Sequence, residues 1–123
     1  MPNYSFNHVH HETTDVDTAV DFYKRVFGAA SDEPYERGGA TWVGVHIGNT
    51  KITVTDREFS EMELGRYQGY DHLALNTDDF DATLAQIEKE NVHIWLGPVG
   101  DSPGRIIFID GPDHIKIEIM EQA

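Results

Sequence analysis

The sequence contains no cysteine, and only nine of its 123 residues are lysine or arginine. The absence of cysteine excludes disulfides, thiolate metal sites and cysteine nucleophiles, and it leaves the redox compartment open. The basic residues stand against 22 aspartates and glutamates, which gives a formal charge of −13 at pH 7. A nucleic-acid partner needs a basic surface, so this balance argues strongly against one. We interpret the charge as a well-solvated surface or as an attraction for a cationic ligand.

The N-terminal residues also lack the features of a targeting segment. Residues 1–5 contain neither a basic region nor an apolar run, so we expect no signal peptide, no membrane partner and a cytoplasmic location. A length of 123 residues fits one domain with a genuine hydrophobic core.

What the sequence does contain is an internal repeat. Segment 7–17 recurs as 71–81, so His8, Thr13 and Asp15 match His72, Thr77 and Asp79 at a constant spacing of 64 residues (72 − 8). Segment 51–54 matches 116–119 at a spacing of 65 (116 − 51), which we interpret as a one-residue insertion in the second half. Half of the chain therefore repeats the other half.

Apolar periodicity predicts the same order of elements in both halves. In the first half it predicts a strand over 6–11, a helix over 16–27 capped by Thr14 or Asp15, and strands over 41–47 and 51–55. In the second half it predicts a strand over 70–75, a helix over 80–90 ended by Asn91, and strands over 92–95, 105–109 and 115–120. The units span 1–57 and 70–123 of a single domain, joined by an acidic, partly helical connection over 58–69.

Strand alternation indicates which histidines share a face. Leu73 and Leu75 mark the core face of their strand, so His72 lies on the opposite face. By the repeat, His8 and His10 lie on that same face. His11 would then point to the core, as Leu75 does.

Glu118 lies opposite the isoleucines of the last strand. If equivalent faces of the two halves line one cavity, then His8, His72 and Glu118 bring together two imidazoles and a carboxylate. This mixed ligand set suits a divalent first-row metal with coordination positions left open. The same pattern is also that of ordinary residues on a solvent-facing strand.

Other side chains are candidates for the same cavity. His10 and His46 are candidate general bases, or they form part of the wall. Lys116 and Arg105 are candidates for holding an anionic group, although solvated lysine and arginine are common. Aromatic side chains could wall an apolar pocket or serve as core or dimer contacts, and they are Trp42, Trp95 and Phe108.

Three segments resemble one known family. They are DVDTAVDFYKRVFG over 15–28, YDH over 70–72 and GPDHIKIE over 111–118. Together with the doubled unit, they resemble the vicinal oxygen chelate superfamily, which includes the glyoxalase, bleomycin-resistance and extradiol dioxygenase proteins. The resemblance covers essentially the whole chain. It implies an α+β fold of two tandem βαβββ units in a cupped eight-stranded mixed sheet. It also implies a homodimer in which each site draws His8 from one protomer and the other ligands from its partner.

The resemblance also implies a ligand set. In that family the metal ligands come from the first and last strands of each unit, which here gives His8, Thr53, His72 and Glu118. Thr53 is not a good metal ligand, so it belongs with the substrate pocket, and its presence argues against glyoxalase I activity. The remaining set resembles that of extradiol dioxygenases and of manganese-dependent fosfomycin-resistance thiol transferases. Leu96 and Phe108 stand where the fosfomycin enzymes carry lysine and tyrosine.

We therefore expect an enzyme that depends on a divalent metal, namely Fe, Mn, Ni or Zn. It would act on a small substrate that chelates the metal through vicinal oxygens, as a dioxygenase, a lyase or isomerase, or a thiol transferase. The alternative is a metal-free, bleomycin-resistance-like protein that sequesters a cationic small molecule. The acidic charge favours this alternative, and the retention of three ligand residues opposes it.

Overall fold

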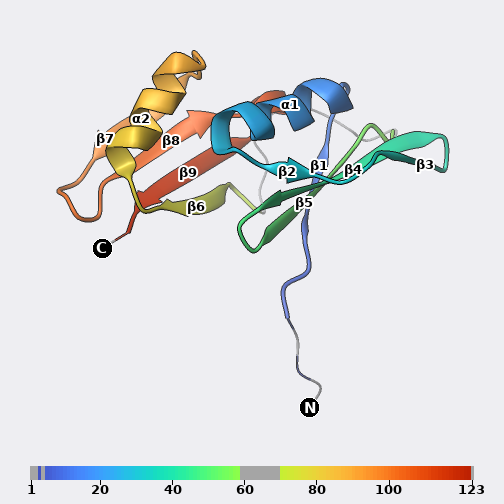
Figure 1. Cartoon of the computed structure of the whole chain (residues 1–123), viewed down its shortest axis with the longest axis horizontal. Coiled ribbons are helices and arrows are strands. Elements are labelled where there is room, and N and C mark those ends of the chain that lie inside the picture. The colour runs from blue at the N-terminus through green and yellow to red at the C-terminus, as the bar shows by residue number, and fades with distance from the viewer. Residues whose placement is uncertain (1–2, 4, 59–69, 123) are drawn as a thin grey trace. The chain divides into compact units, whose positions relative to one another are not determined.

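The fold was analysed in a computed structural model of the chain, which describes residues 3, 5–58 and 70–122. The chain divides into two compact units, Met1–Met62 and Glu63–Ala123. In each unit a helix packs on a mixed sheet (Figure 1). All but the first residue of the expected connection over 58–69 lies outside the described residues.

The first unit contains β1 (Val9–Glu12), α1 (Val16–Phe27), β2 (Ala30–Ser31), β3 (Tyr35–Arg37), β4 (Ala40–Ile47) and β5 (Thr50–Thr55). β1 runs parallel to β5, and β4 pairs antiparallel with β5, β2 and β3. The sequence predicted no strand between the helix over 16–27 and the strand over 41–47, where β2 and β3 lie. Their residues are exposed and show no apolar alternation, so periodicity could not reveal them.

The second unit contains β6 (Leu73–Thr77), α2 (Phe80–Lys89), β7 (Ile94–Val99), β8 (Ile106–Asp110), a 3₁₀ turn (Pro112–His114) and β9 (Lys116–Glu121). Its sheet has the order β6-β9-β8-β7. β7 continues through Gly97 and Pro98, beyond the strand predicted over 92–95, because an edge strand with an irregular register tolerates them. The described residues thus form nine strands in two mixed sheets, where eight were predicted.

The repeat is visible in the hydrogen bonds that start each helix. Asp15 and Asp79 each accept a bond of 3.0 Å from the backbone amide three residues further on. Thr13 and Thr77 in turn accept a bond of 3.2 Å from the amides of these two aspartates. Of the two caps that the sequence allowed for α1, Asp15 is therefore the one formed, and not Thr14.

Strand register locates the predicted one-residue insertion. In the first unit Gly44 pairs with Thr53, and in the second Phe108 pairs with Glu118, which are the equivalent positions at spacings of 64 and 65. The strands of the first hairpin are joined through residues 48–49, and those of the second through Pro112–His114. The extra residue therefore lies in the turn, and the two sheets keep the same register.

Each helix covers one face of the sheet in its own unit (Figure 1). The buried side chains of the first sheet include Val43, Val45, Ile52 and Val54, and those of the second are Ile107, Ile109, Ile117 and Ile119. His11 is 5% exposed, and its Nδ1 lies 2.9 Å from the Tyr23 hydroxyl of α1, which confirms its predicted core position. None of the helices within 5–58 and 70–122 has the length and apolar character needed to cross a bilayer.

Candidate metal and substrate site

The predicted ligand pair of the second unit lies on the far face of its sheet, by which we mean the face away from the helix of that unit. Glu118 lies on β9 between the buried isoleucines 117 and 119. His72 immediately precedes β6, which begins at Leu73 because its pairing with β9 begins there. The His72 Nε2 atom lies 3.4 Å from Glu118 Oε1. The structure therefore brings these two predicted ligands together.

A neighbouring side chain fixes the orientation of each predicted histidine ligand. His72 Nδ1 lies 2.9 Å from Asp71 Oδ2, and His8 Nδ1 lies 2.7 Å from Asn7 Oδ1. Both acceptors are oxygens, so Nδ1 carries the proton and Nε2 keeps its lone pair. This is the tautomer that a histidine needs in order to bind a metal through Nε2. The two units share the arrangement at equivalent positions.

Aromatic rings continue from the ligand pair across the far face of the second sheet. The Phe108 ring lies edge-on to His72, with 5.1 Å between centroids, and the Trp95 ring lies edge-on to Phe108 at 5.6 Å. Lys116 Nζ is 5.2 Å from the centre of the Trp95 ring and is bonded to Asp110. The predicted pocket residue Phe108 therefore lies beside the ligand pair, and Lys116 lies farther along the same face, against Trp95.

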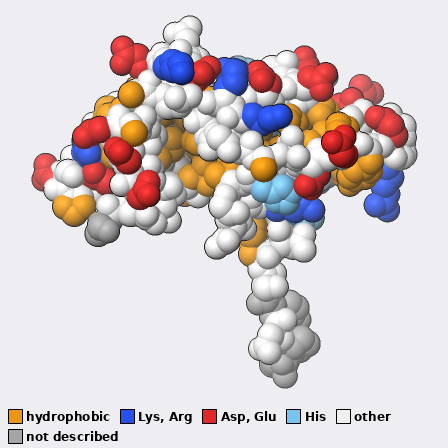
Figure 2. Space-filling model, in the orientation of Figure 1, with side chains coloured by type: hydrophobic (Ala, Val, Ile, Leu, Met, Phe, Trp, Pro, Cys, Tyr) orange, Lys and Arg blue, Asp and Glu red, His pale blue; other side chains and the backbone are white. Residues whose placement is uncertain are grey.

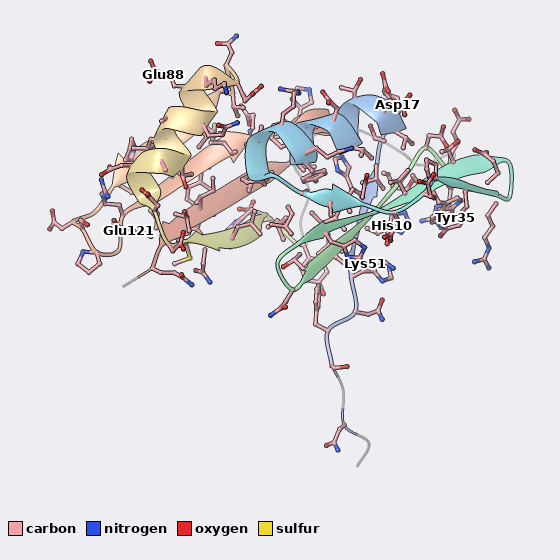
Figure 3. The ribbon with its side chains drawn as sticks, in the orientation of Figure 1. His10, Asp17, Tyr35, Lys51, Glu88 and Glu121 are labelled. Carbon is pink, nitrogen blue, oxygen red and sulfur yellow. The ribbon has the colours of Figure 1, made fainter. Side chains whose placement is uncertain are left out.

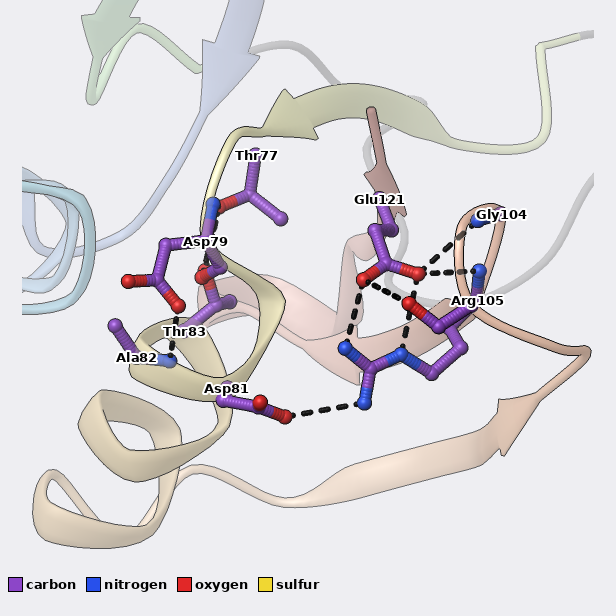
Figure 4. Close-up of polar contacts among 9 residues, drawn as sticks. Thr77, Asp79, Asp81, Ala82, Thr83, Gly104, Arg105 and Glu121 are labelled. Carbon is purple, nitrogen blue, oxygen red and sulfur yellow. Dashed lines mark hydrogen bonds and ion pairs between the residues drawn. The ribbon is translucent and has the colours of Figure 1, made fainter. Parts of the chain in front are cut away.

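Arg105 does not join this cluster. Its guanidinium lies on the helix side, where Nη2 is 2.7 Å from Glu121 Oε2 and Nη1 is 3.0 Å from Asp81 Oδ1 (Figure 4). It also lies 4.6 Å from the centre of the Phe80 ring of α2. The bond from Arg105 lowers the pKa of Glu121 to about 2, and Glu121 in turn raises the pKa of Arg105. These contacts join the last strand to α2.

The far face of the first sheet carries the candidate base His10 (Figure 3). His10 on β1 pairs with Thr53 on β5, which pairs in turn with Gly44 on β4. Its ring lies edge-on to Trp42 at 5.4 Å, and its buried Nε2 lies 3.1 Å from Glu12 Oε1, without a well-aligned hydrogen bond among the described residues. Burial lowers the pKa of His10, and the Glu12 carboxylate offsets only part of that effect. The lowered pKa favours the neutral form of His10, in which one ring nitrogen keeps a lone pair.

Three residues of this face were missed in the sequence, Glu12, Arg57 and Tyr35. Glu12 accepts bonds of 2.9 and 2.6 Å from Arg57 Nε and Nη2, and the Arg57 guanidinium lies 5.4 Å from the centre of the Trp42 ring. The Tyr35 ring stacks on the Trp42 ring, with 6.3 Å between the ring centroids. Alternation from His10 could have indicated Glu12. Arg57 follows the end of β5, where strand alternation no longer applies.

The second candidate base, His46, is held by a carboxylate that the sequence did not single out. His46 Nε2 lies 2.9 Å from Asp32 Oδ2, and the His46 side chain is 40% exposed. Asp32 follows β2, in the segment where the sequence predicted no strand. Lys51 pairs with His46 across β4 and β5.

The donors of the second unit fit part of a divalent metal site. Within the described parts of the chain, no group of three or more His, Cys, Asp or Glu is placed to hold a metal ion. His72 and Glu118 supply one nitrogen and one oxygen donor on adjacent strands, with the imidazole already oriented. The third predicted ligand, His8, belongs to the first unit and has the same orientation through Asn7.

Each half of the chain places a helix on a mixed sheet, and the second unit carries a histidine and a glutamate on its far face. The chain belongs to the Glyoxalase/Bleomycin resistance protein/Dioxygenase superfamily, whose family model matches residues 5–119. This confirms the resemblance found in the sequence and the α+β fold that it implies.

Individual relatives include enzymes and a binding protein. The chain is 29% identical over 118 residues to lactoylglutathione lyase of Escherichia coli O157:H7, covering 88% of this chain and 85% of that protein. It is 34% identical over 96 residues to mitochondrial methylmalonyl-CoA epimerase of Dictyostelium discoideum, covering 72% and 58%. Its fold matches TnmS3, an antibiotic binding protein from Streptomyces sp. CB03234, with a TM-score of 0.76, 25% identity and coverage of 98% and 100%.

Proposed function

We propose that the protein is a divalent-metal-dependent enzyme of the lyase or isomerase type. Its substrate would be a small molecule that offers two adjacent oxygens to the metal, one of them a carbonyl oxygen. The observation that carries this proposal is the His72–Glu118 pair, in which Asp71 fixes the imidazole with its Nε2 lone pair available 3.4 Å from the carboxylate.

The proposed metal ligands are His72, Glu118 and His8. Two imidazoles and one carboxylate suit Fe, Mn, Ni or Zn and leave positions for substrate oxygens. When bound, such an ion supplies Lewis-acid stabilisation of negative charge on a substrate oxygen. Phe108 lies beside the pair and Lys116 lies farther along the same face, against Trp95, and both would contact the rest of the substrate.

Proton transfer is the reaction type that we favour among the three expected from the sequence. The matched relatives include a lyase and an epimerase. The far face of the first sheet carries two imidazoles able to accept a proton, His10 and His46. Thr53 supplies no carboxylate where the second unit has Glu118, so the proposal does not extend to lactoylglutathione as the natural substrate.

Metal analysis tests the proposed ligands directly. The protein should be purified without a nickel column and its metal content measured, followed by melting curves with added Mn, Fe, Ni or Zn. We expect bound metal and a metal-dependent rise in Tm, both lost in His72→Ala and Glu118→Gln. The exposed His93 provides a matched control, and His93→Ala should keep both. No bound metal and unchanged melting curves would refute the proposal.

Solvent exchange tests the reaction type. S-Lactoylglutathione and methylmalonyl-CoA serve as probes, since each carries a carbon-bound proton next to a carbonyl group. In D₂O the metal-loaded protein should incorporate deuterium at that carbon, and Glu118→Gln should not. Metal binding without exchange into either probe would leave the site intact and contradict the proton-transfer assignment for these substrate classes.

We also propose a homodimer that shares its ligands. Each site would take His8 from one protomer, with His72 and Glu118 from its partner. Mixing His8→Ala with Glu118→Ala protein would then restore one intact site in each mixed dimer. If every ligand came from one chain, each site in the mixture would lack one ligand and no metal binding would return.

A metal-free binding protein is the second candidate function. It is favoured by the similarity to antibiotic-binding TnmS3 and by the charge of −13, with acidic side chains spread over the visible face (Figure 2). Titration of the metal-free protein with a cationic glycopeptide such as bleomycin provides the test. Micromolar or tighter binding without metal would favour sequestration over catalysis.

A further inference from the structure

The carboxylate of Asp32 occupies space that only a glycine leaves open. The backbone amide of Asp32 donates a bond of 2.8 Å to the carbonyl of Gly44 on β4. A Cβ atom at Gly44 would lie 2.5 Å from Asp32 Oδ2, which is closer than real contacts allow. The missing side chain of Gly44 therefore provides a seat for Asp32 on the far face of the first sheet.

From this seat Asp32 fixes the orientation of His46. Its Oδ2 lies 2.9 Å from His46 Nε2, and Lys51 Cε would lie 3.4 Å from a Cβ atom at Gly44. A carboxylate can only accept, so His46 donates from Nε2 and keeps its lone pair on Nδ1. A carboxylate that fixes one imidazole nitrogen leaves the other ready to take a proton.

Comparison of the two units shows that the seat belongs to the first unit alone. The position of Gly44 is held by Phe108 in the second unit, and the position of Thr53 by Glu118. The second unit thus carries its carboxylate on the last strand, next to a bulky ring. The first unit lacks both side chains and receives a carboxylate from the segment after β2.

We propose that Asp32, seated on Gly44, is a positioning residue that holds His46 as a proton acceptor. This inference deepens the proposed function and rests on it for the identity of the proton donor. The proton would move from the carbon next to the substrate carbonyl to His46 Nδ1. The electron pair of the C–H bond would stay on the substrate as an enolate, and Asp32 would stabilise the imidazolium until the proton returns.

The tautomer of His46 can be measured without metal or substrate. In ¹⁵N-labelled full-length protein, we expect His46 to carry its proton on Nε2 while it is neutral. Asp32→Ala should remove the hydrogen bond and move the His46 nitrogen shifts to those of a free, solvent-exposed histidine. Gly44→Ala should have the same effect, because the added methyl group displaces the carboxylate. Added to Asp32→Ala, the Gly44→Ala change should have no further effect on His46.

Thr53→Ala is the matched control, since Thr53 is the neighbour of Gly44 on β5, and it should leave the His46 tautomer unchanged. A proton on Nδ1 in the natural protein, or unchanged His46 signals in Asp32→Ala, would overturn the inference. If Gly44→Ala does not fold, the Asp32→Ala variant alone tests the inference. Failure of the proposed function would appear separately, as absent metal binding with the tautomer intact.

A rate measurement then tests whether the positioning matters for the reaction. A positioned base contributes about 10²- to 10⁴-fold. In the deuterium-exchange assay with the better probe, Asp32→Ala should therefore lower the exchange rate at least tenfold and leave KM unchanged. An unchanged rate would overturn the role assigned to Asp32.

Discussion

Hydrogen bonds between Arg105 and Glu121 connect the end of β9 to the loop that precedes β8. Glu121 Oε1 accepts bonds from the amides of Gly104 and Arg105 at 3.0 and 3.2 Å. Its Oε2 accepts a bond of 2.7 Å from Nη2 of the Arg105 guanidinium (Figure 4). In the first unit Asp56 holds the equivalent position and accepts a bond of 2.8 Å from the amide of Thr41. The backbone contact is thus part of the repeat, and the guanidinium is an addition of the second unit.

The Arg105–Glu121 ion pair predicts a specific loss of stability in acid. The pKa of Glu121 is lowered from 4.5 to about 2 in the folded protein, chiefly by Arg105. A lowered folded pKa stabilises the protein above the unfolded pKa, and that contribution is lost as pH falls from 4.5 to about 2. Melting curves should show a smaller fall in Tm over this range for Glu121→Gln than for the natural protein. The exposed Glu88→Gln should behave like the natural protein.

The buried His11–Tyr23 hydrogen bond predicts a stability cost for a small change. Tyr23→Phe removes the hydroxyl that lies 2.9 Å from His11 Nδ1, at a site where Tyr23 is 1% exposed. Loss of a buried hydrogen-bond partner costs about 1–3 kcal/mol. Urea unfolding should therefore show a lower free energy of unfolding for Tyr23→Phe. Tyr35→Phe, at a position that is 50% exposed, should change it by less than about 0.5 kcal/mol. Equal effects of the two changes would contradict this explanation.

The residues that orient the histidines predict graded metal affinity. Asp71→Ala removes the acceptor of the His72 Nδ1 proton and should weaken metal binding by about 10–100-fold. Asn7→Ala should act in the same direction through His8. Calorimetric titration with the metal found in the purified protein provides the measurement, and the exposed Asp78→Ala serves as control. Unchanged affinity in Asp71→Ala would contradict the orienting role of Asp71.

The hairpin turns of the two units should be interchangeable. Replacing residues 112–114 with the Gly-Asn of the first hairpin shortens the turn by one residue without touching the paired strands. It also removes two non-glycine residues with left-handed backbone, Asp113 and His114, at φ 58° and 61°. We expect the free energy of unfolding to stay within about 1 kcal/mol. A loss of folding or of metal binding would show that the turn sets the register.

Much of the fold could be predicted because it follows from local patterns. α1 combines a capping aspartate with apolar positions at helical spacing, and its observed bounds are the predicted ones. β1 and β6 begin later than predicted, since their ends depend on where β5 and β9 pair with them. β2 and β3 exist only through their pairing with β4, which no local pattern records.

The candidate site divides in the same way. Strand alternation placed His72 on the side of Glu118, and the repeat carried the assignment to His8. Asp32 and Arg57 escaped prediction because they lie just outside strands and reach the far face through contacts distant in sequence. Arg105 was one candidate for holding an anionic substrate group, with a solvated side chain as the alternative, and in the structure its guanidinium is bonded to Glu121 and Asp81.

The placement of the extra residue in the second turn has a consequence for the history of the chain. A gene that has been duplicated can lengthen one copy of a turn without moving any paired residue out of step. Each copy can then vary on its far face, because the helix caps and the hydrogen bonds between paired strands keep it folded. Gly44 and Phe108, at equivalent positions of the two sheets, are one such difference between the halves.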